Sequence, residues 1–237
     1  MPTMADRRIV ACGGALFADE ARSLRNYILG EARQANPRVC FLPTATGDHP
    51  EAVTRFYRVA AGHECRPSDL PLFFREVEDL EAFLMEQDVI WVAGGNTANA
   101  LAVWRVHGVD QILRKAWEAG CVMTGASAGM NCWFEASVTD SFSLKKLEGL
   151  RDGLGWLAGS ACPHWDAEEM RRPVYRDLVA GGFPAGVAAE DGVGLVYEGT
   201  ELVEAVSWRP EGAAWLVSGA GSADAVSEER IAARHLR

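Results

Sequence analysis

The sequence lacks the segments that would take a protein out of the cytosol or into a membrane. No stretch approaches the roughly 18 apolar residues of a membrane span, and residues 1–8 contain no apolar core of a signal peptide. The six cysteines form no C-x-x-C pair and stand in apolar surroundings without regular spacing, which is typical of buried free thiols in a reducing compartment. We therefore expect a cytoplasmic protein without disulfides.

Patterns that bind cofactors or metals are also missing. Gly13-Gly14 lacks the G-x-G-x-x-G spacing of dinucleotide sites, there is no G-x-x-x-x-G-K-S/T phosphate loop, and no His/Cys cluster has zinc spacing. His164 and Asp166 stand two residues apart, as metal ligands often do, but nothing nearby in the sequence supplies further convincing ligands. We expect no cofactor and no metal.

The chain is acidic, with 33 Asp and Glu against 23 Lys and Arg and a formal charge of −10. Such a field repels phosphate backbones and anionic lipid, so neither nucleic acid nor a membrane is an expected partner. A length of 237 residues with 49% hydrophobic residues suits one core. No repeat, low-complexity segment or linker divides the chain, and we expect a single domain over residues 1–237, as a monomer or a homodimer.

Short apolar runs alternate with segments of helical periodicity in the first half of the chain. The strand-like runs are Arg8–Cys12, Arg38–Pro43, Asp88–Ala93 and Cys121–Gly125, with a weaker one at Asp69–Leu72. The helical segments are residues 21–35, 51–61, 76–87, 98–107 and 109–119. This order predicts an α/β fold with a doubly wound, mostly parallel sheet. The later runs Val193–Val196, Leu202–Val206 and Ala214–Val217 are separated by turns and predict an antiparallel addition at the sheet edge.

The segment Gly125-Ala126-Ser127-Ala128-Gly129 has the G-x-S-x-G pattern of a nucleophile elbow. It follows one apolar run and precedes another, Met130–Phe134, so it is placed where a strand turns sharply into a helix. Small flanking residues permit such a tight turn and leave the serine hydroxyl projecting at the strand end. We predict that Ser127 is a nucleophile; the alternative is a structural turn.

A serine nucleophile needs a base and an acid that orients it. Of the five histidines, His164 is the best candidate for the base, since it follows a small-residue run that can end a strand. Asp191, at a glycine turn before the run from Val193, is our choice for the acid, with Glu190 as its substitute. A solvated acidic turn is the alternative.

The oxyanion of acyl transfer needs two N–H donors. The N–H of Ala128 lies at the start of the helix that follows the elbow, and the loop Gly94-Gly95-Asn96-Thr97 has the freedom to supply a second donor from Gly95. Asn96 and Thr97 of this loop are predicted to contact the substrate. A capping turn without chemistry is the alternative for the loop.

The order Gly-Gly-Asn-Thr, Gly-Ala-Ser-Ala-Gly, Pro-His and an acid-Gly turn resembles the peptidase E family of serine peptidases. This family includes aspartyl dipeptidases and, more distantly, cyanophycinases, and the resemblance spans about residues 8–220. It implies a fold similar to class I glutamine amidotransferases and a triad of Ser127, His164 and an acid. Family members commonly carry glutamate as the acid, and alignment on the following glycine turn places Asp191 there instead.

The resemblance further implies a serine dipeptidase that acts on Asp-X dipeptides through an acyl-enzyme. Such a site must neutralise a substrate carboxylate, for which an arginine fork is suited. Arg171 follows His164 by a short segment, where the arginine of the family that recognises aspartate is expected, and the alternative is a solvated charge at a helix start.

Two other functions are compatible with the elbow. An α/β-hydrolase esterase would use the chain order Ser, acid, His, with Ser127, Asp191 and His235 as its triad, although the oxyanion loop of that class is missing. A binding protein without catalysis that kept the scaffold is the other.

Overall fold

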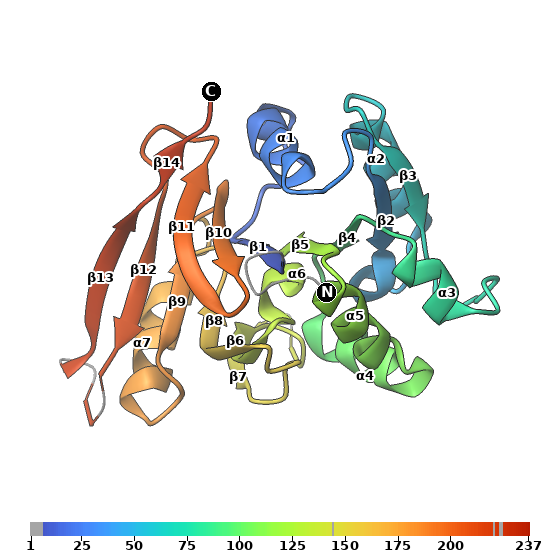
Figure 1. The fold of residues 1–237 in the computed structure, drawn as a ribbon. Helices are drawn as coiled ribbons and strands as arrows, with labels where there is room; N and C mark the ends of the chain where they lie inside the picture. Colours follow the sequence, from blue (N-terminus) through green and yellow to red (C-terminus); the bar gives the residue numbers. More distant parts are fainter. Residues whose placement is uncertain (1–6, 144, 220, 223–224) are drawn as a thin grey trace.

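The computed structural model describes residues 7–143, 145–219, 221–222 and 225–237, and in this part of the chain two mixed β-sheets carry helices on their faces (Figure 1). Residues 1–6 contain most of the segment in which no signal peptide was expected, and they lie outside the described residues. Among the described helices, none combines the length and the apolar character needed to span a bilayer.

The larger sheet has eight strands among the described residues, in the order β14-β11-β10-β1-β5-β4-β2-β3. Their bounds are β1 Arg8–Cys12, β2 Arg38–Leu42, β3 Arg66–Asp69, β4 Val89–Val92, β5 Val122–Ala126, β10 Val193–Glu198, β11 Glu201–Ser207 and β14 Arg234–His235. Strands β1 to β5 are all parallel, whereas β10 runs antiparallel to β1 and β11 antiparallel to β10. The predicted parallel sheet with an antiparallel addition is confirmed.

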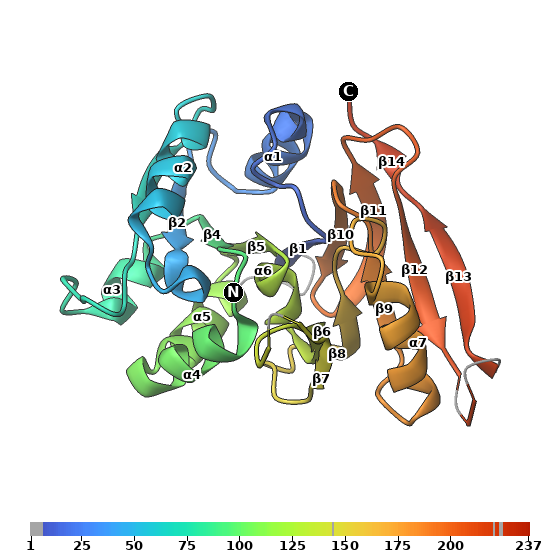
Figure 2. The ribbon, with the colours of Figure 1, turned by 180° about the vertical axis from the view of Figure 1, so that it is seen from behind.

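Helices cover both faces of this sheet, as expected of a doubly wound fold. The two helices α1 and α2 lie on one face and α3, α4 and α5 on the other (Figures 1 and 2). The bounds are α1 Arg22–Gly30, α2 Pro50–Ala60, α3 Leu80–Met85, α4 Thr97–His107 and α5 Val109–Glu118, with the 3-10 turns η2 Asp19–Ala21 and η3 Pro43–Thr46. The segments 21–35 and 76–87 were therefore predicted too long. Helix α3 begins only where the Asp79 side chain accepts the N–H of Ala82.

The smaller sheet has six strands among the described residues, in the order β13-β12-β9-β8-β6-β7. Their bounds are β6 Phe134–Thr139, β7 Glu148–Leu150, β8 Leu157–Cys162, β9 Gly186–Ala189, β12 Ala213–Ser218 and β13 Ser227–Ala232, and α7 (Arg171–Ala180) packs against it. Our assignment of Ala214–Val217 to the edge of the larger sheet was wrong, because β12 pairs with β9 and β13. No local sequence pattern predicted a second sheet.

The buried apolar side chains form two clusters, and the larger one reaches both sheets, since it includes Phe134 of β6, Leu157 of β8 and Val187 of β9. The larger cluster combines β1, β2, β4, β5 and β10 with the inner faces of α1, α4 and α5, and includes the fully buried Trp104 and Trp117. The smaller one places Tyr175 and Val179 of α7 against strands β6, β8 and β9. Both sheets are therefore fixed by buried packing, and the loops at the ends of their strands form the candidate site described next.

Candidate active site

Ser127 lies between β5 and the single-turn helix α6 (Ala128–Asn131) in a conformation that is rare for a residue with a side chain. Its φ is 60° and its ψ is −113°, which is the strained geometry of a nucleophile elbow. The glycines of the motif have a steric reason, since a Cβ on Gly125 or Gly129 would lie 2.5 Å from the Val92 carbonyl oxygen. The helix after the elbow is shorter than predicted, because Phe134 already begins β6.

His164 and Asp191 form a hydrogen-bonded pair next to this elbow. The Nδ1 atom of His164 lies 2.7 Å from Oδ1 of Asp191, and the two side chains are 18% and 26% exposed. His164 adopts a positive φ of 57°. Glu190, the alternative acid, points elsewhere: its Oε2 accepts the N–H of Ala213, and burial raises the pKa of its carboxyl. The geometry thus pairs the imidazole with Asp191 and not with Glu190.

The end of β1 ties the serine and the histidine to one place. The N–H of Ser127 donates to the Cys12 carbonyl and the N–H of His164 donates to the Gly13 carbonyl, both at 3.3 Å. Gly14, the next residue, accepts from the N–H of Gly192 and forms an isolated β-bridge with Asp191. Three consecutive residues of one loop therefore position all three candidate triad members.

Gly14 also leaves the space that the His164–Asp191 pair occupies. A Cβ at this position would lie 2.6 Å from Nδ1 of His164 and equally close to Cγ of Asp191. The sequence drew attention to Gly13-Gly14 only as a failed dinucleotide motif. Its actual role is a close approach of backbone to side chains, which glycine alone permits.

The backbone N–H groups of Gly95 and Ala128 have no acceptor within the described residues, and the same holds for their neighbours Gly94 and Gly129. Ala128 is the first residue of α6, so its N–H has no partner inside the helix. A Cβ on Gly94, next to Gly95, would lie 3.4 Å from the Ser127 Cβ. Gly95 has a φ of 129° and packs against Ala45, which excludes a side chain. Of the two predicted oxyanion donors, Ala128 thus belongs to the elbow itself and Gly95 to the neighbouring loop.

Asn96 and Thr97 use their side chains to hold the same loop. The side-chain Oδ1 of Asn96 caps α4 by accepting the N–H of Asn99, and its Nδ2 donates to the Ser141 carbonyl. Thr97 is 1% exposed, and its hydroxyl accepts from the Asn131 side chain. The predicted substrate contact of these two residues stays a prediction, and what the structure gives them is a supporting place in the loop.

Arg171 is embedded at the start of α7. Its side chain is only 3% exposed; Nε donates to the Glu168 carboxylate at 2.6 Å, and a terminal nitrogen donates to the Val138 carbonyl at 2.9 Å. The bond to Val138 joins α7 to strand β6. Because the side chain is buried, little of the guanidinium surface is accessible to a substrate carboxylate.

Asp166 and Arg209 hold the backbone of Asp191 by hydrogen bonds. The sequence did not indicate this role for either residue. Asp166 accepts the backbone N–H of Asp191 at 2.9 Å and forms an ion pair of 2.5 Å with Arg209. The same Arg209 nitrogen donates to the Asp191 carbonyl at 2.9 Å. The hydrogen bond to Asp166 raises the pKa of Arg209 above its ordinary value. The only signal in the sequence was the short distance from His164 to Asp166.

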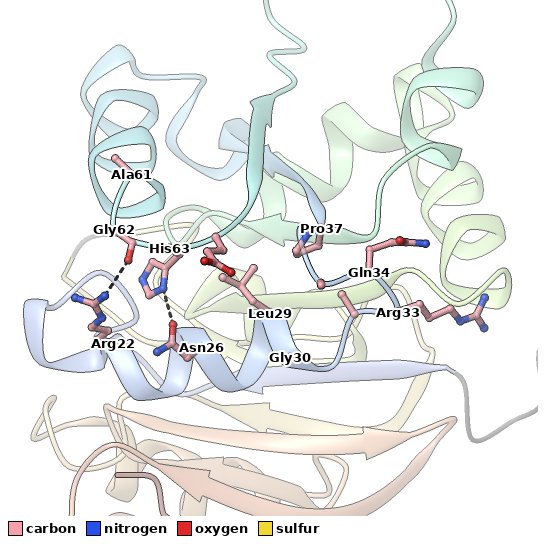
Figure 3. Close-up of a pocket in the computed structure, with 13 residues that line it drawn as sticks. Arg22, Asn26, Leu29, Gly30, Arg33, Gln34, Pro37, Ala61, Gly62 and His63 are labelled. Atoms are coloured by element: carbon pink, nitrogen blue, oxygen red, sulfur yellow. Dashed lines mark hydrogen bonds between the residues drawn. The ribbon is translucent and has the colours of Figure 1, made fainter.

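One cavity lies away from this chemistry. It measures about 870 Å³ and lies between α1, the chain before Pro37 and the end of α2 (Figure 3). A smaller cavity of about 440 Å³ is lined by Phe41 of β2 and by Ala93 and Gly94, which follow β4. Ligand sites in parallel sheets lie at the carboxyl ends of strands. The smaller cavity approaches Ser127 through Gly94, so of these two cavities it is the better placed for a substrate.

Comparison with known proteins identifies the family. The family model described as Peptidase family S51 matches residues 9–205. The chain belongs to peptidase family S51. An uncharacterized peptidase of Bacillus subtilis (strain 168), YgaJ, is 45% identical over 214 residues, which cover 89% of this chain and 92% of that protein. Membership of S51 makes the chain a serine-type peptidase and confirms the resemblance to peptidase E.

Solved structures show the same fold as this S51 chain. A peptidase from an acI-B1 Actinobacterium superposes with a TM-score of 0.64 at 17% identity, covering 95% of this chain and 94% of the other. A candidate peptidase E protein from Listeria monocytogenes EGD-e also gives a TM-score of 0.64, at 18% identity, with coverages of 85% and 98%. The class I glutamine amidotransferase-like fold that the resemblance implied agrees with these neighbours.

The α/β-hydrolase alternative does not fit an S51 member. His235, which that alternative needs as its base, lies in the exposed strand β14, paired in register with Ser207 of β11. Asp191, which it needs as the acid, is hydrogen-bonded to His164.

Proposed function

We propose that this S51 peptidase is a dipeptidase that hydrolyses Asp-X dipeptides through a triad of Ser127, His164 and Asp191. The observation that carries the proposal is the 2.7 Å pair of His164 and Asp191, held together with the strained Ser127 by the three consecutive residues at the end of β1. Positive φ at a serine is costly and is typical of an elbow that presents a nucleophile.

The mechanism follows from the orientation of the His164 imidazole. Because Nδ1 of His164 faces Asp191, its Nε2 is the nitrogen available to take the proton of Ser127 as the hydroxyl attacks the scissile carbonyl. The unpaired N–H groups of Gly95 and Ala128 would stabilise the oxyanion. His164 then protonates the leaving amine, and water, deprotonated by the same imidazole, releases the acid from the acyl-enzyme. These steps use side chains and backbone groups of this chain alone.

We make further proposals about the domain organisation, oligomeric state, cellular location and partners of the chain. We propose that the chain works as one domain, as a monomer or homodimer, in the cytoplasm. The supporting observation is that all six cysteines are free, five of them buried. Burial raises the pKa of these thiols, that of Cys12 to about 12, so they are unreactive. The charge of −10 speaks against nucleic acid and anionic membranes as partners.

The substrate class is tested by a dipeptide screen with purified protein. For Asp-Ala, Asp-Leu and other Asp-X dipeptides, kcat/KM should be at least ~100-fold higher than for the Asn-X counterparts. A site built to bind a carboxylate is left with an unpaired charge when it holds the neutral amide of asparagine. N-acetylated Asp-X and longer peptides serve as controls for a free amino terminus and for length. Equal rates on Asn-Ala and Asp-Ala would contradict the proposed specificity, and cleavage of blocked peptides would contradict the dipeptidase assignment.

Arg209 is expected to act as a positioning residue for Asp191. Arg209→Gln removes the bond to the Asp191 carbonyl and the pair with Asp166, so kcat should fall about 10- to 100-fold, the range of hydrogen bonds to charged groups, with KM little changed. Arg209→Lys should restore part of kcat. Arg230→Gln is the matched control, since Arg230 is exposed and donates to the Glu211 carbonyl. A loss of melting temperature without a change in kcat would give Arg209 a structural role instead.

A further inference from the structure

Asn131 is a buried polar residue that the proposed mechanism does not use. It is the last residue of α6, one turn after Ser127, and its backbone N–H donates to the Ser127 carbonyl at 2.9 Å. The residue is 3% exposed. A buried side-chain amide is unfavourable unless it is hydrogen-bonded, so the partners of this amide indicate what it does.

The Asn131 side chain extends from the elbow to the Gly94–Thr97 loop. Its Nδ2 donates to the hydroxyl oxygen of Thr97 at 3.2 Å. Thr97 begins α4, is 1% exposed and lies two residues after Gly95, whose N–H is the second predicted oxyanion donor. One side chain thus connects the helix of the nucleophile elbow with the loop that carries this donor.

A second bond fixes the Asn131 amide on the smaller sheet. Nδ2 also donates to the carbonyl of Val138 in β6 at 3.2 Å, and this carbonyl accepts a terminal nitrogen of Arg171 at 2.9 Å. Val138 is fully buried. Because its acceptor is held by both β6 and α7, the amide has a defined position from which it holds Thr97.

The bond from Asn131 to Thr97 joins the two segments directly. The ladder between β4 and β5 ends at the pair of Val92 and Gly125. Beyond that pair, and within the described part of the chain, this bond is the one hydrogen bond between residues 94–97 and residues 127–131. Steric packing limits how closely the segments approach, whereas a directional bond also sets their relative position.

The relative position of the segments matters because the two oxyanion donors belong to different ones. The N–H of Ala128 is part of the elbow and moves with Ser127, but the N–H of Gly95 is not. Donors stabilise an oxyanion when they lie about 2.7–3.1 Å from it, and a misplacement of about 1 Å can cost about 100-fold in rate. The second donor therefore needs a link to the elbow.

We propose that Asn131 is a positioning residue that fixes the Gly95 N–H relative to Ser127 and thereby keeps the oxyanion site pre-organised. The inference rests on the proposed function for the roles of Ser127 and Gly95, but not for the identity of the peptide. Because Asn131 is buried, it acts through Thr97 and does not touch the substrate.

Removing either end of the bond tests the inference. Asn131→Ala deletes the amide and keeps the backbone bond to the Ser127 carbonyl, and Thr97→Val deletes the hydroxyl at nearly constant size. Each change should lower kcat about 10- to 100-fold with KM within about threefold, because a misplaced donor weakens the transition state more than substrate binding. The double variant should lose little more than Asn131→Ala alone, because both changes break the same bond.

Labelling by a serine-directed phosphonate makes the test independent of the peptide. When the Ser127 oxygen displaces the leaving group of the probe, the phosphoryl oxygen presents its negative charge to the same donors. The second-order rate constant of labelling should therefore also fall about 10- to 100-fold in both single variants. If the wild-type protein is labelled but does not cleave Asp-X dipeptides, only the proposed substrate falls, and the labelling rates still decide the inference.

Gln87→Ala is the matched control. Gln87 is likewise buried, its amide nitrogen donates to the Phe83 carbonyl, and its amide oxygen, like that of Asn131, has no partner among the described residues. It precedes β4, at the opposite end of that strand from Gly94. Gln87→Ala should lower the melting temperature as Asn131→Ala does and leave kcat and the labelling rate unchanged.

Several results would overturn the inference. Unchanged rates in both folded single variants would do so, as would a loss confined to one of them or an equal loss of kcat in Gln87→Ala. A double variant that shows the product of the two single losses would mean that the bond does not couple the residues. If Asn131→Ala fails to fold, Thr97→Val decides. A wild-type Ser127 that is neither labelled nor active overturns the inference together with the proposed function.

Discussion

Replacing Ser127 by alanine should abolish peptide hydrolysis, with kcat reduced by about 10⁶-fold as in other enzymes that lose a triad serine. The hydroxyl is the atom that forms the acyl-enzyme, and nothing else in the described elbow can take its place. The fold should survive, because alanine and serine have nearly the same size and face the same cost at a φ of 60°. Melting temperature and circular dichroism check the fold, and a dipeptide assay by amine release checks the rate.

The control for this change is Ser143→Ala, which alters an exposed loop serine and should keep full activity. A serine-directed phosphonate probe adds an independent readout, since it should label the wild-type protein and not the Ser127→Ala variant. Turnover that persists in a clean Ser127→Ala preparation would contradict the assignment of the nucleophile. A wild-type protein that resists the probe and binds a dipeptide without cleaving it would instead be a binding protein on a peptidase scaffold.

A single methyl group at Gly14 should be almost as damaging as loss of the triad acid. The Cβ of Gly14→Ala would fall 2.6 Å from Nδ1 of His164, so the imidazole and Asp191 could no longer keep their hydrogen bond. Without an oriented imidazole, we expect a loss in kcat of about 10⁴-fold, as when the acid of a triad is disabled. Steady-state kinetics with an Asp-X dipeptide measures the effect.

Gly30→Ala is the matched control, because a Cβ at Gly30 meets no atom within 4 Å. It should leave the rate unchanged. A folded Gly14→Ala variant that kept its activity within a factor of about three would show that the close packing of Gly14 against His164 and Asp191 is irrelevant to catalysis. It would also contradict the claim that Asp191 orients the His164 imidazole.

The parallel half of the fold could be predicted because its strands are apolar on both faces. Runs such as Val89–Val92 are wholly buried and stand out from the amphipathic helices beside them. The smaller sheet lacks this signal. Strand β7 has three residues, and β13 reads Ser-Glu-Glu-Arg-Ile-Ala with no fully buried position. Pairing with distant strands, not local pattern, makes these segments strands.

The residues of the candidate site likewise differ in whether they could be selected from the sequence alone. Ser127 and His164 stand in short motifs with a local physical meaning, so they could be selected from the sequence. The choice between Glu190 and Asp191 could not be made locally, because both precede the same strand and only the backbone direction decides which faces the imidazole.

The position of Asp191 has a consequence for how the protein loses activity. The residue lies in the short connection where the chain leaves β9 of the smaller sheet and enters β10 of the larger one, and Ser127 lies where the chain passes from β5 of the larger sheet through α6 to β6 of the smaller one. Any loosening of one sheet against the other would therefore pull on both connections and disturb the triad before either sheet melts. In a urea titration, hydrolysis should fail at a lower concentration than the far-ultraviolet signal, making enzyme activity a gauge of how firmly the two sheets are docked.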